Sequence, residues 1–89
     1  MDNMDLVAAH SHCTANFNEL MLSDNCGCFY CLEIYRPQEI TSWVTERTGE
    51  QTATCPRCII DSVIGDASGL PITAGFLRAM HEQWFGHLE

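Results

Sequence analysis

Two Cys-x-x-Cys motifs, Cys28-Phe-Tyr-Cys31 and Cys55-Pro-Arg-Cys58, carry the side chains of this sequence best suited to chemistry. The 23 residues from Leu32 to Thr54 are enough to let the two motifs meet around one ion. Four thiolates at this spacing are typical of a structural zinc site, in which the protein fills every coordination position. The sequence therefore predicts a structural Zn²⁺ bound by Cys28, Cys31, Cys55 and Cys58.

Cys26 is a rival ligand, because Cys26-Gly27-Cys28 places a third thiol two residues away. We expect it to be a small, partly buried neighbour of the site. Six cysteines could instead form disulfides in a secreted protein. The acidic start of the sequence, Met1-Asp-Asn-Met-Asp5, lacks the charge and apolar run of a signal peptide. We therefore expect a cytoplasmic protein whose thiols bind metal.

An iron-binding electron carrier is one alternative, since the second motif is similar to the Cys-Pro-x-Cys motif of rubredoxins. Rubredoxins have a glycine after each motif, where this sequence has Leu32 and Ile59. Those glycines bring backbone N–H groups close to sulfur, which tunes the redox couple. Zinc is the better prediction for this reason.

A nuclease that uses histidine and a catalytic metal is a second alternative, since many such enzymes also carry a four-cysteine zinc site. It needs a histidine base, metal ligands and basic groups along the scissile strand. His10, His12 and Asp61 are the available candidates, and His10 and Cys13 could share a helix face. We expect the histidines to be surface residues and the protein not to be an enzyme.

The charge balance limits the partners. The sequence contains twelve acidic residues, four arginines and no lysine, which gives a formal net charge of −8. A Zn²⁺ ion bound by four thiolates would add a charge of about −2. Nucleic acid is therefore an unexpected partner, because phosphate binding depends on Lys and Arg. No apolar run is long enough to span a membrane. A protein partner is expected.

Acidic side chains on one face would support another hypothesis, an inhibitor from a phage or mobile element that mimics nucleic acid. The candidates for such a face are Asp2, Asp5, Glu19, Glu33, Glu39, Glu46 and Glu50.

Three helices are expected around the cysteine motifs. Apolar residues at steps of three and four from Leu6 to Leu20 predict a helix over residues 4–22. Pro37 favours the start of a second helix that buries Ile40, Trp43 and Val44 and ends at Thr48-Gly49. Pro71 and Thr73 precede a third helix over 71–86 that ends at Gly86. The expected core face of that helix consists of Phe76, Leu77, Met80 and Trp84.

Short strands are expected over 29–35 and 52–54, with a strand or tight turn over 59–64. The loop Gly65–Gly69 follows, and in and beside it lie Asp61, Ser62, Asp66 and Ser68. We expect these four to satisfy backbone donors in turns, with a ligand pocket as the alternative. The prediction is one small α+β domain over 1–89, with a zinc-ribbon or treble-clef-like centre over 26–64.

The segments Cys26-Gly-Cys-Phe-Tyr-Cys-Leu-Glu-Ile34 and Thr52-Ala-Thr-Cys-Pro-Arg-Cys58, with Ile60-Asp-Ser-Val-Ile-Gly-Asp-Ala-Ser-Gly69, resemble a family of small bacterial proteins described only as cytoplasmic proteins. The resemblance covers about residues 10–85 and implies a zinc-ribbon-like intracellular protein, with no activity attached. Ile59 stands where that family often has glycine. Since isoleucine does not readily adopt a positive φ, the second motif is expected to differ in geometry there.

Together these observations favour a non-enzymatic, zinc-stabilised module that binds another protein. The sequence makes no prediction of the partner's identity or of the oligomeric state.

Overall fold

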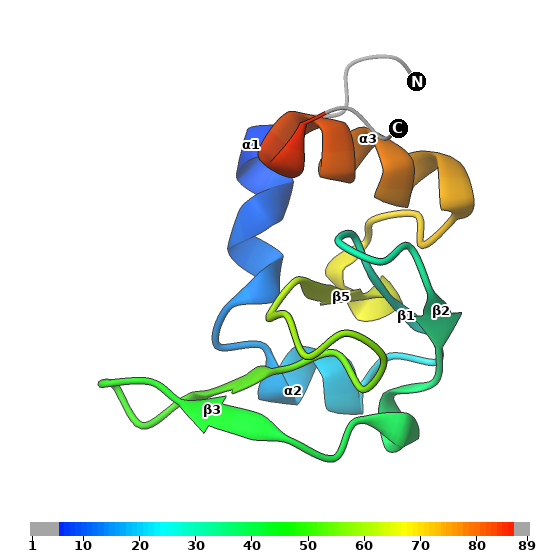
Figure 1. The fold of residues 1–89 in the computed structure, drawn as a ribbon. Coiled ribbons are helices and arrows are strands. Elements are labelled where there is room, and N and C mark those ends of the chain that lie inside the picture. Colours follow the sequence, from blue (N-terminus) through cyan, green and yellow to red (C-terminus); the bar gives the residue numbers. More distant parts are fainter. Residues whose placement is uncertain (1–5, 87–89) are drawn as a thin grey trace.

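Three α-helices and two small antiparallel sheets make up a small α+β fold over residues 6–86, the part of the chain that the computed structural model describes (Figure 1). The helices are α1 (Leu6–Ala9), α2 (Phe17–Met21) and α3 (Ala74–Phe85). The strands are β1 (Cys26–Cys28), β2 (Ile34–Tyr35), β3 (Trp43–Thr45), β4 (Gln51–Ala53) and β5 (Val63–Gly65). Short 3₁₀ turns are η1 (His10–Cys13), η2 (Pro37–Glu39) and η3 (Asp66–Ser68).

The central sheet has the order β2-β1-β5, and β1 pairs antiparallel with both neighbours. Strands β3 and β4 form a separate hairpin that extends to one side of the molecule (Figure 1). Both Cys-x-x-Cys motifs are attached to these strands. The first follows from β1, and the second lies between β4 and β5.

The first expected helix is interrupted, so one continuous helix over 4–22 is wrong. The chain leaves helical geometry after η1 and re-enters it at α2, with Ala15 at φ +52°. The break places the Asn16 side chain in the interior, where its amide donates to the Val63 carbonyl (2.8 Å) and its oxygen accepts from the Ala53 N–H (3.1 Å). Asn16 thus joins the central sheet to the hairpin, and these contacts outweigh local helix propensity.

The expected second helix is also wrong. Pro37 does begin a helical turn, but only η2 forms, and Trp43 then pairs with Ala53 in the hairpin. Val44 and Thr45 are β-branched and suit a strand. Gly49 lies at φ +92° in the hairpin turn, so it connects two strands and does not end a helix as expected.

The third helix is confirmed. The Thr73 side chain caps its start by accepting from the Phe76 N–H (3.2 Å), and the helix ends before Gly86. Phe76, Leu77 and Met80 are buried as expected. Trp84 is instead 37% exposed, with its indole N–H donating to the Leu6 carbonyl.

The strand predictions are confirmed in part. The strand expected over 52–54 is β4, and the apolar stretch over 59–64 contributes β5. Of the strand expected over 29–35, only β2 forms, because residues 29–33 make the loop around the first motif. Strand β1 was not expected.

Two apolar clusters lie on opposite sides of the central sheet. One contains the side chains of Cys26, Cys28 and Val63. The other contains Ile64 and the buried face of α3. Val63 and Ile64 are consecutive strand residues, so their side chains point to opposite faces. The cysteine motifs therefore share one face of the sheet with the first cluster. Within residues 6–86, no helix has the length and apolar character needed to cross a membrane.

Gly65 allows α2 to pack closely on the sheet, and we predict that Gly65→Ala is destabilising. The added Cβ would lie 2.9 Å from Leu20 Cδ2 and would also meet the Ser23 hydroxyl. That hydroxyl cannot move freely, since it donates to the Glu19 carbonyl. We expect a loss of about 1–3 kcal/mol in unfolding free energy, as for other overpacked sites. Urea unfolding of the metal-loaded protein measures it.

Gly75→Ala is the matched control, because nothing lies within 4 Å of a Cβ at this exposed position in α3. It should increase stability by about 0.5–1 kcal/mol. Equal effects of the two substitutions would contradict the close packing at Gly65.

Candidate metal centre

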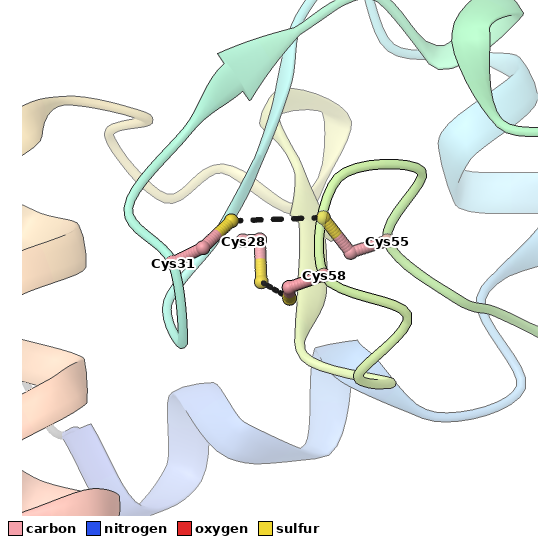
Figure 2. Close-up of side chains that lie close together, drawn as sticks. All are labelled: Cys28, Cys31, Cys55 and Cys58. Carbon is pink, nitrogen blue, oxygen red and sulfur yellow. Dashed lines mark hydrogen bonds between the residues drawn. The ribbon is translucent and has the colours of Figure 1, made fainter.

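The four predicted cysteine ligands come together on one side of the central sheet. Their sulfur atoms all lie within 4.8 Å of one another, with Cys28 and Cys58 3.6 Å apart and Cys31 and Cys55 3.7 Å apart (Figure 2). A zinc ion with Zn–S bonds of about 2.3 Å requires sulfurs about 3.8 Å apart in a tetrahedron. In residues 6–86, this is the one group of three or more side chains placed to hold a metal ion.

The two motifs fold into matching loops, here called knuckle 1 (residues 28–32) and knuckle 2 (residues 55–59). In both, the N–H two residues after the first cysteine donates to its sulfur at 3.3 Å. The N–H four residues after it donates to its carbonyl at 2.8 Å, again in both. The first cysteine's own N–H donates at 3.0 Å to the carbonyl five residues on. Two unrelated tetrapeptides thus adopt one backbone geometry that directs N–H dipoles at sulfur.

The last residue of each knuckle is in the left-handed region, Leu32 at φ +68° and Ile59 at φ +75°. The expectation that Ile59 would alter the geometry of knuckle 2 is therefore wrong. For residues with a Cβ, this conformation costs about 1–2 kcal/mol each. The loop hydrogen bonds and the convergence of the sulfurs must outweigh that cost.

Burial keeps most of the thiols in their neutral form in the absence of a cation. It raises the pKa of Cys31 to about 11, raises that of Cys28 still further, and raises that of Cys26 to about 12. Cys55 differs. Burial also opposes its ionisation, but the nearby Tyr35 hydroxyl and the N–H groups of knuckle 2 favour the thiolate and lower its pKa to about 7. Cys55 is therefore the thiol among these that ionises most readily, and a bound cation would displace the protons of the others.

A charged pair covers the outer side of knuckle 2. Arg57 donates to Glu39 at 2.7 Å, and its guanidinium carbon lies 5.3 Å from the centre of the Tyr35 ring. Arg57 is thus engaged by a carboxylate of its own chain.

Knuckle 1 is held from the opposite side of the sheet by α3. The buried His81 donates through Nδ1 to the carbonyls of Phe29 and Tyr30, each at 3.0 Å. The sequence analysis did not identify His81, because its partners lie more than 50 residues away in the sequence. The available signal was its position four residues after Leu77, which places both side chains on the same face of α3.

The remaining cysteines lie beside the site or away from it. Cys26 lies outside the group of four sulfurs that could hold a metal ion, and it is fully buried rather than partly buried as expected, with its thiol donating to the Tyr35 carbonyl at 3.5 Å. Cys13 packs in the other core cluster, 3.9 Å from His10 Nε2.

The histidines of the nuclease hypothesis point to other partners. His12 Nδ1 lies 2.9 Å from Glu19, and His10 packs on the Trp84 ring at 4.1 Å. In the described part of the chain, neither histidine joins Asp61 in a group of potential metal ligands.

Around Gly65–Gly69, the expected turn chemistry is confirmed for Asp66 and Ser68. The Asp66 carboxylate accepts from the N–H groups of Asp24 and Asn25, at 3.0 and 3.2 Å. The Ser68 hydroxyl donates to the Gly65 carbonyl at 2.7 Å. Ser62 is buried, with its carbonyl accepting from the Phe29 N–H, and Asp61 is exposed. The side chains of Asp66 and Ser68 therefore stabilise the backbone of this loop and of residues 24–25.

No protein-family model, curated protein or solved structure matches this chain, so the geometry above carries the argument about function.

We predict that Cys55→Ser abolishes the cooperative fold, because it removes one of the four candidate metal ligands. Structural zinc is worth an apparent ~10–16 kcal/mol in peptides, as much as the ~5–15 kcal/mol that holds a typical domain. Circular dichroism during thermal unfolding, with and without chelator, measures the effect. Cys26→Ser is the matched control and should retain both the metal and the fold. A cooperative transition in wild type that chelator leaves unchanged would refute the prediction.

We further predict that Ile59→Gly increases the stability of the metal-loaded protein. The side chain is 76% exposed, so little packing is lost, while the left-handed strain is removed. The net gain should be up to about 1 kcal/mol, since glycine also makes the unfolded chain more flexible.

Leu32→Gly is the contrasting variant, because Leu32 packs against the second core cluster. It should be neutral or destabilising in the same urea titration. A clear loss of stability in Ile59→Gly would contradict the assignment of strain to this residue.

Proposed function

We propose that Cys28, Cys31, Cys55 and Cys58 bind one structural Zn²⁺ and that the chain is a zinc-ribbon-like module. The observation that carries this proposal is the pair of matching knuckles that bring four sulfurs to tetrahedral spacing. Each knuckle leads into or out of a strand, and the central sheet packs directly on the site. Four cysteine ligands leave no coordination position for a substrate, which supports a structural role over catalysis.

We propose further that this module acts in the cytoplasm, as the resemblance to bacterial cytoplasmic proteins implies, by binding another protein. Knuckle 2 supplies the main support. Ile59 is a large apolar side chain, mostly exposed and held in a costly conformation. Glycine would serve the fold better here, and strained residues that persist are characteristic of functional sites. Ile59 also borders a hollow of about 240 Å³ lined by Thr41, Ser42, Thr54, Cys55 and Pro56.

Electrostatics favours a basic protein partner. The chain carries a net charge of −8 without lysine, and a zinc centre would make it more negative. Mimicry of nucleic acid has weaker support, since Glu19 and Glu39 are held by His12 and Arg57. Asp2 and Asp5 lie outside the described residues. No observation favours the nuclease hypothesis.

Elemental analysis and affinity capture test the proposal together. The protein purified from cells should contain one zinc per chain, and iron in its place would support an electron carrier. Immobilised wild type should then retain a basic protein from native lysate that elutes as salt is raised.

Ile59→Gly tests the contact site, because it keeps the metal ligands and should lose the retained protein. Val44→Ala is the matched control, since Val44 is also an exposed apolar residue but belongs to the hairpin. Retention of nucleic acid alone would contradict the proposal. Equal retention by Ile59→Gly would exclude knuckle 2 as the contact.

A further inference from the structure

The Tyr35 side chain is buried against the metal centre with its hydroxyl unsatisfied. Tyr35 is 4% exposed and packs in the cluster that contains Cys26, Cys28 and Cys55. In the described part of the chain, its hydroxyl is the one buried side-chain oxygen or nitrogen without a hydrogen-bond partner. Such a group costs free energy unless a partner is supplied, so it calls for an explanation.

The strand register places this hydroxyl toward the sulfur atoms. Tyr35 in β2 stands opposite Cys26 in β1, and residues opposite each other in an antiparallel pair share a face of the sheet. Cys26 and Cys28 are two residues apart and point to that same face. The Tyr35 ring therefore extends across the face that carries the metal ligands, in the same buried cluster as Cys55, and its hydroxyl lies near the Cys55 sulfur without a hydrogen bond to it.

Metal binding changes what that sulfur can accept. A neutral thiol is a weak acceptor, whereas an ionised group accepts a hydrogen bond that is shorter and roughly twice as strong. A cation bound by the four cysteines requires Cys55 as the thiolate. The metal-loaded state thus supplies the acceptor that the phenol lacks.

We propose that Tyr35 is a positioning residue of the metal centre, whose hydroxyl donates a hydrogen bond to the metal-bound Cys55 thiolate. This inference rests on the proposed metal centre and deepens it. The Tyr35 hydroxyl adds a side-chain donor to the backbone N–H that already reaches Cys55, whereas Cys28 has no such tyrosine. The Cys55 thiolate of knuckle 2 would therefore be stabilised by one more hydrogen bond than the Cys28 thiolate of knuckle 1.

Arg57 and Glu39 hold the tyrosine in place from the solvent side. The guanidinium lies over the ring within the distance of a cation–π contact, and the Glu39 carboxylate fixes the guanidinium. A positive charge over the ring withdraws electron density from the phenol and strengthens its O–H as a donor. These side-chain contacts form a series, Glu39–Arg57–Tyr35–Cys55, that leads from the protein surface to the metal centre.

Tyr35→Phe tests the proposal, because it removes only the hydroxyl and keeps the ring. Outer partners of metal ligands usually contribute 10–100-fold to affinity, so the apparent Kd for Zn²⁺ should rise by about that factor. With Co²⁺ as a spectroscopic probe, the sulfur-to-cobalt charge-transfer band should move to longer wavelength, since the thiolate loses a stabilising hydrogen bond. A purely structural role for Tyr35 would not move this band.

Tyr30→Phe is the matched control, because Tyr30 is the other tyrosine, is 43% exposed, and contributes only its backbone N–H and carbonyl to knuckle 1. It should bind Zn²⁺ and Co²⁺ as wild type does. Unchanged affinity and spectrum in Tyr35→Phe would overturn the hydrogen bond and leave the metal centre intact. Failure of wild type to bind either metal would overturn the proposed centre itself.

A measurement on wild type covers the case in which Tyr35→Phe does not fold. The zinc-loaded protein should show a slowly exchanging hydroxyl proton from Tyr35 in its ¹H NMR spectrum. Rapid exchange of that proton with solvent would overturn the proposal.

Discussion

The convergence of four sulfurs is the constraint on which the rest of this structure depends. The described elements are short: four of the strands have three residues, one has two, and the longest helix has twelve. Such elements form few hydrogen bonds of their own, and isolated helices of this length are marginal in water. The two knuckles fix the ends of β1 and β5 together with the loops that follow β1 and β4. Joining the two knuckles through their four cysteines therefore holds both sheets in one arrangement.

Strand β1 transmits this constraint to the rest of the molecule. One of its faces carries the cysteines, and the other lies under α3, which approaches so closely that a Cβ on Gly27 would lie 2.8 Å from Leu77. His81 reaches knuckle 1 from α3, while Tyr35 reaches the sulfurs from β2. Knuckle 1 thus packs against the core with Tyr30 as its exposed residue, whereas knuckle 2 leaves Arg57 and Ile59 at the surface. The same backbone geometry therefore serves a largely covered loop and a more exposed one.

The parts of this fold that could be predicted from sequence are those decided over short distances. The ligands follow from motif spacing, and α3 follows from its cap, its periodicity and Gly86. The errors have a common physical origin in contacts between distant residues. The helical pattern before Asn16 is sound, but Asn16 bonds to groups 37 and 47 residues away that no local pattern reveals. Likewise, Trp43 and Val44 suit either a helix face or a strand until Ala53 and Thr52 pair with them.

Ile59 shows a different kind of limit, in which the sequence preference was read correctly and still did not decide the conformation. Isoleucine disfavours positive φ, yet knuckle 2 requires it, because the N–H of this residue must reach the Cys55 carbonyl for the loop to close. Leu32 meets the same requirement in knuckle 1 but recovers part of the cost by packing against the second core cluster. Ile59 has no such compensation inside the fold, since three quarters of its surface is exposed. The geometry of knuckle 2 therefore imposes this conformation on Ile59, and the rest of the fold does not offset its cost. This imbalance is the observation on which the proposed protein contact at knuckle 2 rests.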